Sequence, residues 1–134
     1  MTQEEFDRAL TEKRAREEAL AASFAVVPDS EIEALLREFI ACKYFLLPED
    51  LKRNDLIALG NLSTARMAGY QQAGIQFREK SAGCTTASSG VIKKVLLAIA
   101  IGKLIGKKLD PDAVAQVETV PQMAELIVQT RRSR

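Results

Sequence analysis

The sequence predicts an all-α protein, and three observations support this fold class. Thr2–Glu5 and Ser30–Glu33 both have the S/T-x-x-E form of a capping box, in which a hydroxyl and a carboxylate bond the first turn of a helix. Apolar residues recur at helical spacing in the segments after these boxes. No segment shows the strict alternation of apolar and polar residues that is typical of a half-buried strand. We therefore expect a small helical bundle.

Four segments are expected to form the main helices: residues 3–23, 31–46, 91–106 and 121–129. The first has a thin apolar stripe, so it should pack on the surface of the domain or mediate association. Residues 54–74 suit one or two short helices, because glycines interrupt them. Residues 78–90 are small and polar, which indicates a loop that delivers Ser88 or Ser89 as the N-cap of the third helix. Thr119 is expected to cap the last helix.

The segment 90–109 is the element around which the chain is expected to fold. On a helix, one broad side of it carries Val91, Ile92, Val95, Ala98, Ile99 and Ile105. The other side carries Leu97, Ala100, Ile101 and Leu104 among five lysines, Lys93, Lys94, Lys103, Lys107 and Lys108. A helix that is apolar nearly all round is buried on more than one side. We therefore expect this helix to be the most buried of all.

The composition limits the class of protein. A chain of 134 residues that is 47% hydrophobic and 28% charged has the composition of a soluble globular domain. Its net charge of +1 gives no reason to expect a nucleic-acid partner. The N-terminal residues are charged and lack an apolar core, so no signal peptide is expected, and the longest apolar run is shorter than the ~20 residues that span a bilayer. The expected compartment is the cytoplasm.

The side chains offer little chemistry for an enzyme. The chain has no histidine and only two cysteines, so neither a zinc site of the usual kind nor a nucleophile–base pair is expected. Cys42 falls in a helical apolar pattern, which favours a buried structural thiol. Cys84 precedes a helix N-terminus, where the dipole favours a thiolate, but it has no neighbouring base. We expect no catalytic residue, no metal and no enzymatic activity.

Two blocks of the sequence resemble the acyl carrier protein family. Residues 30–51, SEIEALLREFIACKYFLLPEDL, resemble the first helix of that family and the acidic turn after it. Residues 90–127 resemble, without a gap, the segment of the family that extends from its second helix into its last helix. In both, an aliphatic residue (here Leu109) precedes a short acidic helix and an aliphatic-x-Thr-Val approach to the last helix (here Val117–Val120). The resemblance covers under half of the chain and rests on spacing.

The resemblance implies a particular organisation of the fold. We expect a single domain, residues 1–134, containing an acyl-carrier-like four-helix bundle over residues 30–128. Residues 1–27 would be an N-terminal helical extension. Residues 52–89 would be a long helical insertion between the first and second bundle helices. This insertion is expected to add a helix over the exposed apolar side of the central one.

Two departures from the family bear on function. The family attaches 4′-phosphopantetheine to the serine of an Asp-Ser-Leu motif, and this sequence has Gly90-Val91-Ile92 in its place. Valine offers no nucleophile, so no cofactor is expected. The family's second helix is acidic, whereas this one is basic, so the resemblance implies a protein partner with an acidic surface, such as an enzyme of an acyl or peptidyl pathway. The chain would be a degenerate, non-catalytic docking module whose partner-binding residues are Lys93, Lys94, Lys103, Lys107 and Lys108.

Two alternatives stay open. The chain is a working acyl or peptidyl carrier if 4′-phosphopantetheine is attached to Ser89 or Ser88, which lie two and three positions before the family's serine. The ordinary role of both hydroxyls is helix capping. In the other alternative, the chain is an unrelated helical interaction or regulatory protein. Homo-oligomerisation is compatible with each of these hypotheses.

Overall fold

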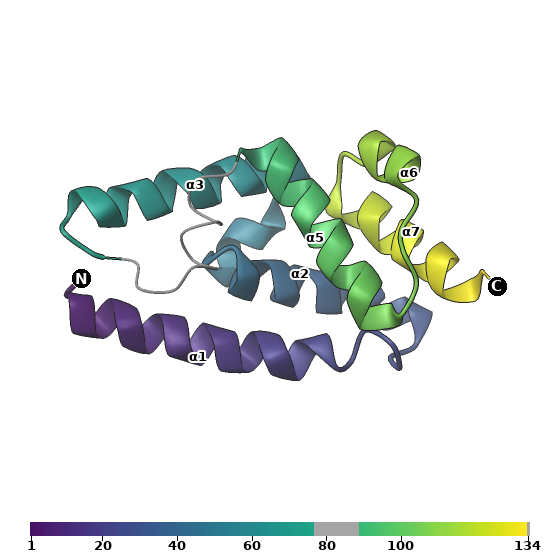
Figure 1. Ribbon diagram of the computed structural model, residues 1–134, viewed down its shortest axis with the longest axis horizontal. Helices are drawn as coiled ribbons and strands as arrows, with labels where there is room; N and C mark the ends of the chain where they lie inside the picture. Colours follow the sequence, from purple (N-terminus) through teal and green to yellow (C-terminus); the bar gives the residue numbers. More distant parts are fainter. Residues whose placement is uncertain (77–88, 134) are drawn as a thin grey trace.

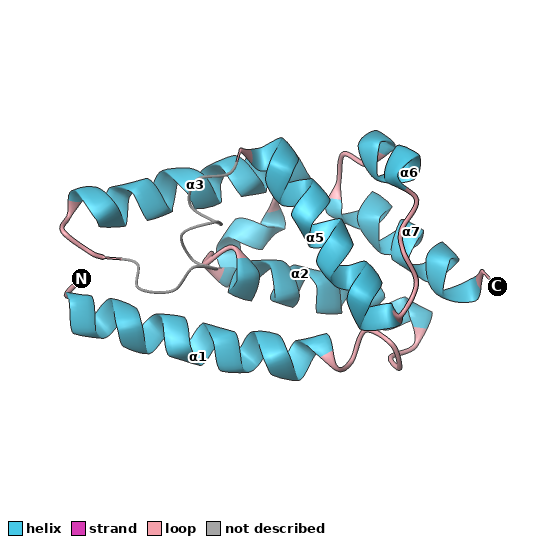
Figure 2. Cartoon of the chain, in the orientation of Figure 1, coloured by secondary structure: helices cyan, strands magenta, loops and turns pink. Residues whose placement is uncertain are grey.

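The computed structural model describes residues 1–76 and 89–133, and helices joined by short loops make up most of them (Figures 1 and 2). The elements in chain order are α1 (Gln3–Ala21), the 3₁₀ turn η1 (Asp29–Glu31), α2 (Ile32–Lys43), the 3₁₀ turn η2 (Pro48–Lys52), α3 (Leu56–Gln72), α5 (Gly90–Ile105), α6 (Pro111–Gln116) and α7 (Val120–Arg132). Extended pairing within these ranges is limited to an isolated bridge between Asp55 and Thr119. The predicted all-α class is confirmed, and a helix lies in each of the four predicted main segments. Residues 54–74 differ from the expectation of short, interrupted helices, because α3 is one continuous helix of 17 residues.

Side-chain caps fix most helix starts. The Thr2 hydroxyl accepts from the Glu5 amide at 3.1 Å, and the Ser89 hydroxyl accepts from the Ile92 amide at 3.4 Å. Thr119 forms a capping box at the start of α7. The box predicted at Ser30 is wrong, because Ser30 lies inside η1 and α2 starts without a side-chain cap. The 3₁₀ turn supplies the bond instead, since the Ile32 amide donates to its backbone.

The predicted second helix, 31–46, is longer than α2, which ends at Lys43. Phe45 adopts a left-handed backbone conformation with φ of 56°. A residue in that conformation cannot continue a right-handed helix. The reversal directs the Phe45 ring toward α1 and α3, where it stacks at 5.2 Å from the ring of Phe6.

The main core lies between α2, α5, α6 and α7. Its fully buried side chains repeat at helical spacing on α2 and α7, as amphipathic helices require: Ile32, Leu36 and Ile40, then Val120, Met123 and Ile127. Helix α1 runs along α2 on the outside of this core (Figure 1). It buries only Phe6 and Leu20. This agrees with the prediction that a helix with a thin apolar stripe packs on the surface of the domain.

A second, smaller hydrophobic cluster joins the N-terminal helix α1 to α3 and the residues on either side of α3. Phe6 of α1, Phe45, Met67 of α3 and Ile75 pack together there. The Gln3 side chain completes the contact, because its amide donates to the Gln76 carbonyl at 2.9 Å and its oxygen accepts from the Gln76 amide at 2.7 Å. The N-terminal helix therefore packs against α3 and the described residues next to it.

Helices α3 and α5 meet through two glycines. A Cβ added to Gly60 would lie 2.8 Å from the Cα of Gly90, and one added to Gly90 would lie 2.3 Å from the Ile57 carbonyl oxygen. The Gly90 amide also donates to the Asn61 side chain at 2.8 Å. Only glycine permits this approach of two backbones. The contact fixes how α5 is rotated about its axis.

Candidate functional site

The apolar pattern of α5, which extends nearly all round the helix, left open which face is buried, and the structure shows that face. Gly90, Lys93, Leu97 and Ile101 succeed one another at spacings of three or four and are buried on one face. The opposite face carries five large apolar side chains that are 44–52% exposed: Val91, Ile92, Val95, Leu96 and Ile99. The prediction that this helix is the most buried element is therefore wrong. Helix α3 packs on the glycine side, so the expected cover over the apolar side is also wrong for the part of the chain that the structure describes.

Lys93 and Lys94, predicted as partner-binding residues, are buried, with exposed fractions of 2% and 5%. The Lys94 ammonium donates to the Val117 carbonyl at 2.9 Å, so it bridges α5 to the connection between α6 and α7. The Lys93 ammonium has no hydrogen-bond partner among the described residues and lies 5.9 Å from the centre of the Tyr44 ring. Lys94 therefore supports the fold, and neither buried ammonium is available to a partner.

The other three predicted lysines lie around the C-terminal end of α5. Lys107 donates to the backbone carbonyls of Arg131, at 2.9 Å, and of Ser133, so it caps the end of α7. Lys103 and Lys108 are exposed, and neither forms an ion pair with a described residue. The cationic surface that sequence reasoning placed along the whole helix is therefore limited to its last turn and the adjoining loop.

An apolar groove of about 650 Å³ continues the exposed face of α5 toward this cationic end. Helix α5 forms one wall with Val95, Ala98, Ile99 and Gly102. The other wall comes from Leu109 and from α6, with Pro111, Val114 and Ala115. Lys103, Lys107 and Lys108 are its charged lining residues, and no described acidic side chain lines it. We use the name α5 groove for this cavity together with the exposed side chains of Ile92, Val95 and Ile99.

The C-cap of α5 explains why the groove and the lysines adjoin. Gly106 has φ of 72°, a left-handed conformation that ends the helix and reverses the chain. The reversal brings Lys107 and Lys108 beside the last turn and returns Leu109 to the core, where it is 4% exposed. Asp110 then caps α6 through the Asp112 amide. The wall that α6 contributes was missed by sequence reasoning, because only the turn at Gly106 brings it next to α5.

The predicted attachment positions fall at the opposite end of α5. Ser89 is exposed and its hydroxyl caps the helix, as predicted. Val91 is 52% exposed and carries no nucleophile, whereas Gly90 is packed against α3. Ser88 and Cys84 lie outside the described residues.

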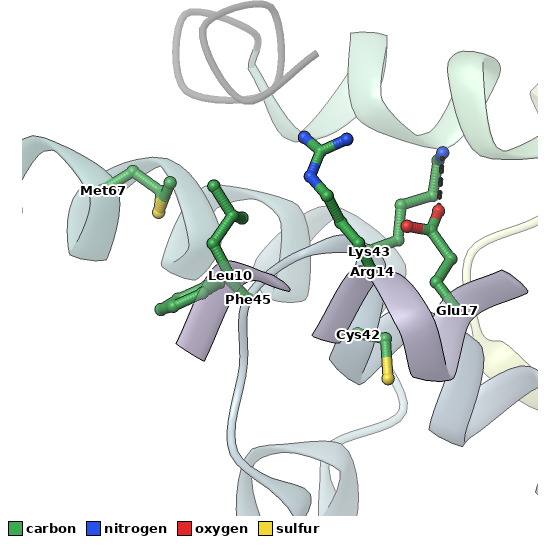
Figure 3. Close-up of a pocket in the computed structure, with 7 residues that line it drawn as sticks. All are labelled: Leu10, Arg14, Glu17, Cys42, Lys43, Phe45 and Met67. Carbon is green, nitrogen blue, oxygen red and sulfur yellow. Dashed lines mark hydrogen bonds and ion pairs between the residues drawn. The ribbon is translucent and has the colours of Figure 1, made fainter. Parts of the chain in front are cut away.

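A second, much smaller cavity is lined by residues of α1, α2 and α3 (Figure 3). Its volume is about 30 Å³, about the space of one water. Glu17 and Lys43 form an ion pair at 3.3 Å at its edge. Cys42, which lines it, is partly buried, and desolvation raises the pKa of its thiol. A thiol with a raised pKa is a poor nucleophile near neutral pH.

Comparison with models of protein families, with curated proteins and with solved structures finds no match. Among residues 1–76 and 89–133, no three His, Cys, Asp or Glu side chains lie together as metal ligands would. Within the same ranges, no helix has the length and apolar character that crossing a bilayer requires. The α5 groove is therefore the candidate site on geometric grounds alone.

Proposed function

We propose that this chain is a non-catalytic docking module of the acyl-carrier type, and that it binds a protein partner through the α5 groove. The observation that carries the proposal is the exposed apolar face of α5, with five large side chains between 44% and 52% exposed. Contiguous apolar surface of this kind marks binding sites in proteins. Because the face adjoins a cavity, it offers both a flat contact area and a pocket for anchoring side chains.

The order of elements supports the carrier-like part of the proposal. Helix α2, a long connection, α5, the short α6 and α7 succeed one another as the resemblance implies. Valine at the position of the family's serine supports a module that docks without carrying a covalent group. The expected partner is an enzyme or scaffold of an acyl or peptidyl pathway.

The docking function is tested by capture with matched variants. The wild-type chain, Ile99→Gln and the control Val26→Gln are immobilised and exposed to a lysate of the source organism. Val26 is 77% exposed and is not part of the α5 groove, so its variant controls for loss of exposed apolar surface. We expect one or more lysate proteins to be retained by the wild type and by Val26→Gln but not by Ile99→Gln. When such a retained protein is purified, calorimetry should show that it binds the wild type and Val26→Gln but not Ile99→Gln. If Ile99→Gln retains the same proteins as the wild type, the proposal is contradicted.

A second function, a working carrier with 4′-phosphopantetheine on Ser89 or Ser88, is favoured by one observation. Ser89 presents an exposed hydroxyl at the start of α5. Incubation with a broad-specificity phosphopantetheinyl transferase and coenzyme A decides between the two. We expect an unchanged intact mass, because the family's serine position holds Val91. A mass increase that disappears in Ser89→Ala or Ser88→Ala would establish the carrier instead.

A further inference from the structure

The exposed side chains of α5 have the spacing of a helix–helix seam. Ile92, Val95 and Ile99 are separated by three and four residues, as are the apolar residues along one side of a coiled coil. From Ile92 to Ile99 the seam runs about 10 Å, at about 1.5 Å per residue, and Lys103 follows one turn later. An apolar seam of this length matches about two turns of another helix, and a third turn of that helix would lie beside Lys103.

The charged side chains that line the α5 groove in the described part of the chain are all lysines, and they lie at one end of it. Lys103 and Lys108 are exposed there without an ion-pair partner among the described residues, and no described acidic side chain lines the cavity. Nearer the start of the seam, the exposed side chains that α5 presents are apolar (Val91, Ile92, Val95 and Leu96), and Lys93 and Lys94 are buried. A ligand that fills the groove must therefore be apolar along most of its length and gains from negative charge at one end only.

We propose that the α5 groove binds an amphipathic helix of a protein partner, with apolar side chains along the seam and carboxylates beside Lys103 and Lys108. This inference rests on the proposed docking function and adds the chemistry of the partner. Apolar side chains of the helix enter the cavity between α5 and α6, next to Ile99. The two lysines then set the direction in which the helix lies, because its acidic end has to meet them.

An unbiased selection tests the inference. A display library of helical peptides of about four turns, with every outward position randomised, is selected on the wild-type chain and depleted on Ile99→Gln. We expect the enriched peptides to share apolar residues at i, i+3 or i+4, and i+7, with Asp or Glu clustered at one end. Enrichment of peptides without acidic residues, or no enrichment over the depleted pool, overturns the inference.

Matched lysine variants test the charge contribution in solution. The best peptide is titrated by fluorescence anisotropy against the wild type, the Lys103→Glu/Lys108→Glu double variant and the control Lys52→Glu, an exposed lysine on η2. We expect the double variant to bind the peptide about tenfold more weakly than the wild type at low salt. The control should bind with the affinity of the wild type. The difference in affinity between the wild type and the double variant should shrink as salt is added. Lys107 is left unchanged because it caps α7. Equal affinity of the wild type and the double variant overturns the inference.

Two other occupants of the groove would also overturn it. In sedimentation equilibrium without peptide, self-association that Ile99→Gln abolishes would assign the groove to a second copy of the chain. Binding to phosphatidylglycerol vesicles that is lost in the same variant, and that the peptide does not compete, would assign it to a lipid surface. If a captured protein depends on Ile99 but not on Lys103 and Lys108, the docking function stands and the acidic helix is refuted.

Discussion

Replacing Lys93 by methionine should stabilise the protein. Lys93 is 2% exposed, and its ammonium has no hydrogen-bond partner among the described residues. Burial lowers the pKa of this amine from 10.5 to about 8. Each pKa unit corresponds to about 1.4 kcal/mol, so holding the charged form in the folded protein at pH 7 costs about 3 kcal/mol. The methionine variant avoids this cost but loses the contact with the Tyr44 ring, worth about 1 kcal/mol.

We therefore expect Lys93→Met to raise the free energy of unfolding by about 2 kcal/mol at pH 7. Urea unfolding gives this difference directly, and the melting temperature should rise by several degrees. Lys94→Met is the matched control, because its ammonium bonds the Val117 carbonyl at 2.9 Å. That variant should lose stability, by about 1–2 kcal/mol.

The pH dependence gives an independent check. The folded-state pKa of Lys93 lies below its unfolded value, so the unfolded chain binds more protons between about pH 8 and pH 10.5. The stability of the wild type relative to Lys93→Met should therefore increase with pH, by about 1 kcal/mol between pH 7.5 and pH 9. Comparing the two proteins cancels the opposing contributions of Tyr44 and Cys42, whose pKa values are both raised by burial. Two results would refute the interpretation that the Lys93 amine is desolvated. One is a Lys93→Met variant that is no more stable than the wild type at pH 7. The other is a dependence of stability on pH that is the same for the two proteins.

Two further predictions concern the contacts that fix the fold. Gly90→Ala should destabilise the protein by about 1–3 kcal/mol, because its Cβ would lie 2.3 Å from the Ile57 carbonyl oxygen. In contrast, a Cβ added to Gly69 on α3 has no atom within 4 Å, so Gly69→Ala should stabilise the protein by up to about 1 kcal/mol. Equal urea midpoints for the two variants would show that α3 and α5 are not in contact at Gly90. Asp50→Asn should cost about 1–3 kcal/mol at pH 7, since both Asp50 oxygens accept from Arg66 and this bonding lowers the Asp50 pKa. Because the folded-state pKa is the lower one, this stabilisation is lost as pH falls through it, so thermal melts of the variant and the wild type should converge in acid and differ at neutral pH.

Local chemistry was enough to predict the helix positions. The hydroxyls of Thr2, Ser89 and Thr119 cap the helices that their sequence neighbours predicted, because a cap needs only residues within one turn. The capping box predicted at Ser30 is absent because Ser30 itself lies within the 3₁₀ turn Asp29–Glu31. That turn is tied to the far end of the chain through the ion pair of Asp29 with Arg132.

The face that α5 presents could not be predicted in the same way. A helix that is apolar nearly all round has no hydrophobic pattern that selects one side, so its rotation is decided by a specific contact. Here the contact joins Gly90 to Gly60, two residues far apart in the sequence. Lys93 and Lys94 were expected on the surface because lysine is rarely buried. The α5 groove was missed because a helix that is apolar nearly all round was expected to be buried on more than one side.

The glycine contact also dictates the sequence of steps by which this protein could be engineered into a carrier. Val91→Ser would place a hydroxyl on a half-exposed position at little structural cost. The aspartate that precedes the serine in carrier proteins is a different matter, because any side chain at Gly90 meets the Ile57 carbonyl oxygen. The helix containing Ile57 and Gly60 would have to be redesigned first, so that α5 gains room. An aspartate introduced at position 90 before that redesign would destabilise the protein, whereas the serine at position 91 can be introduced at any stage.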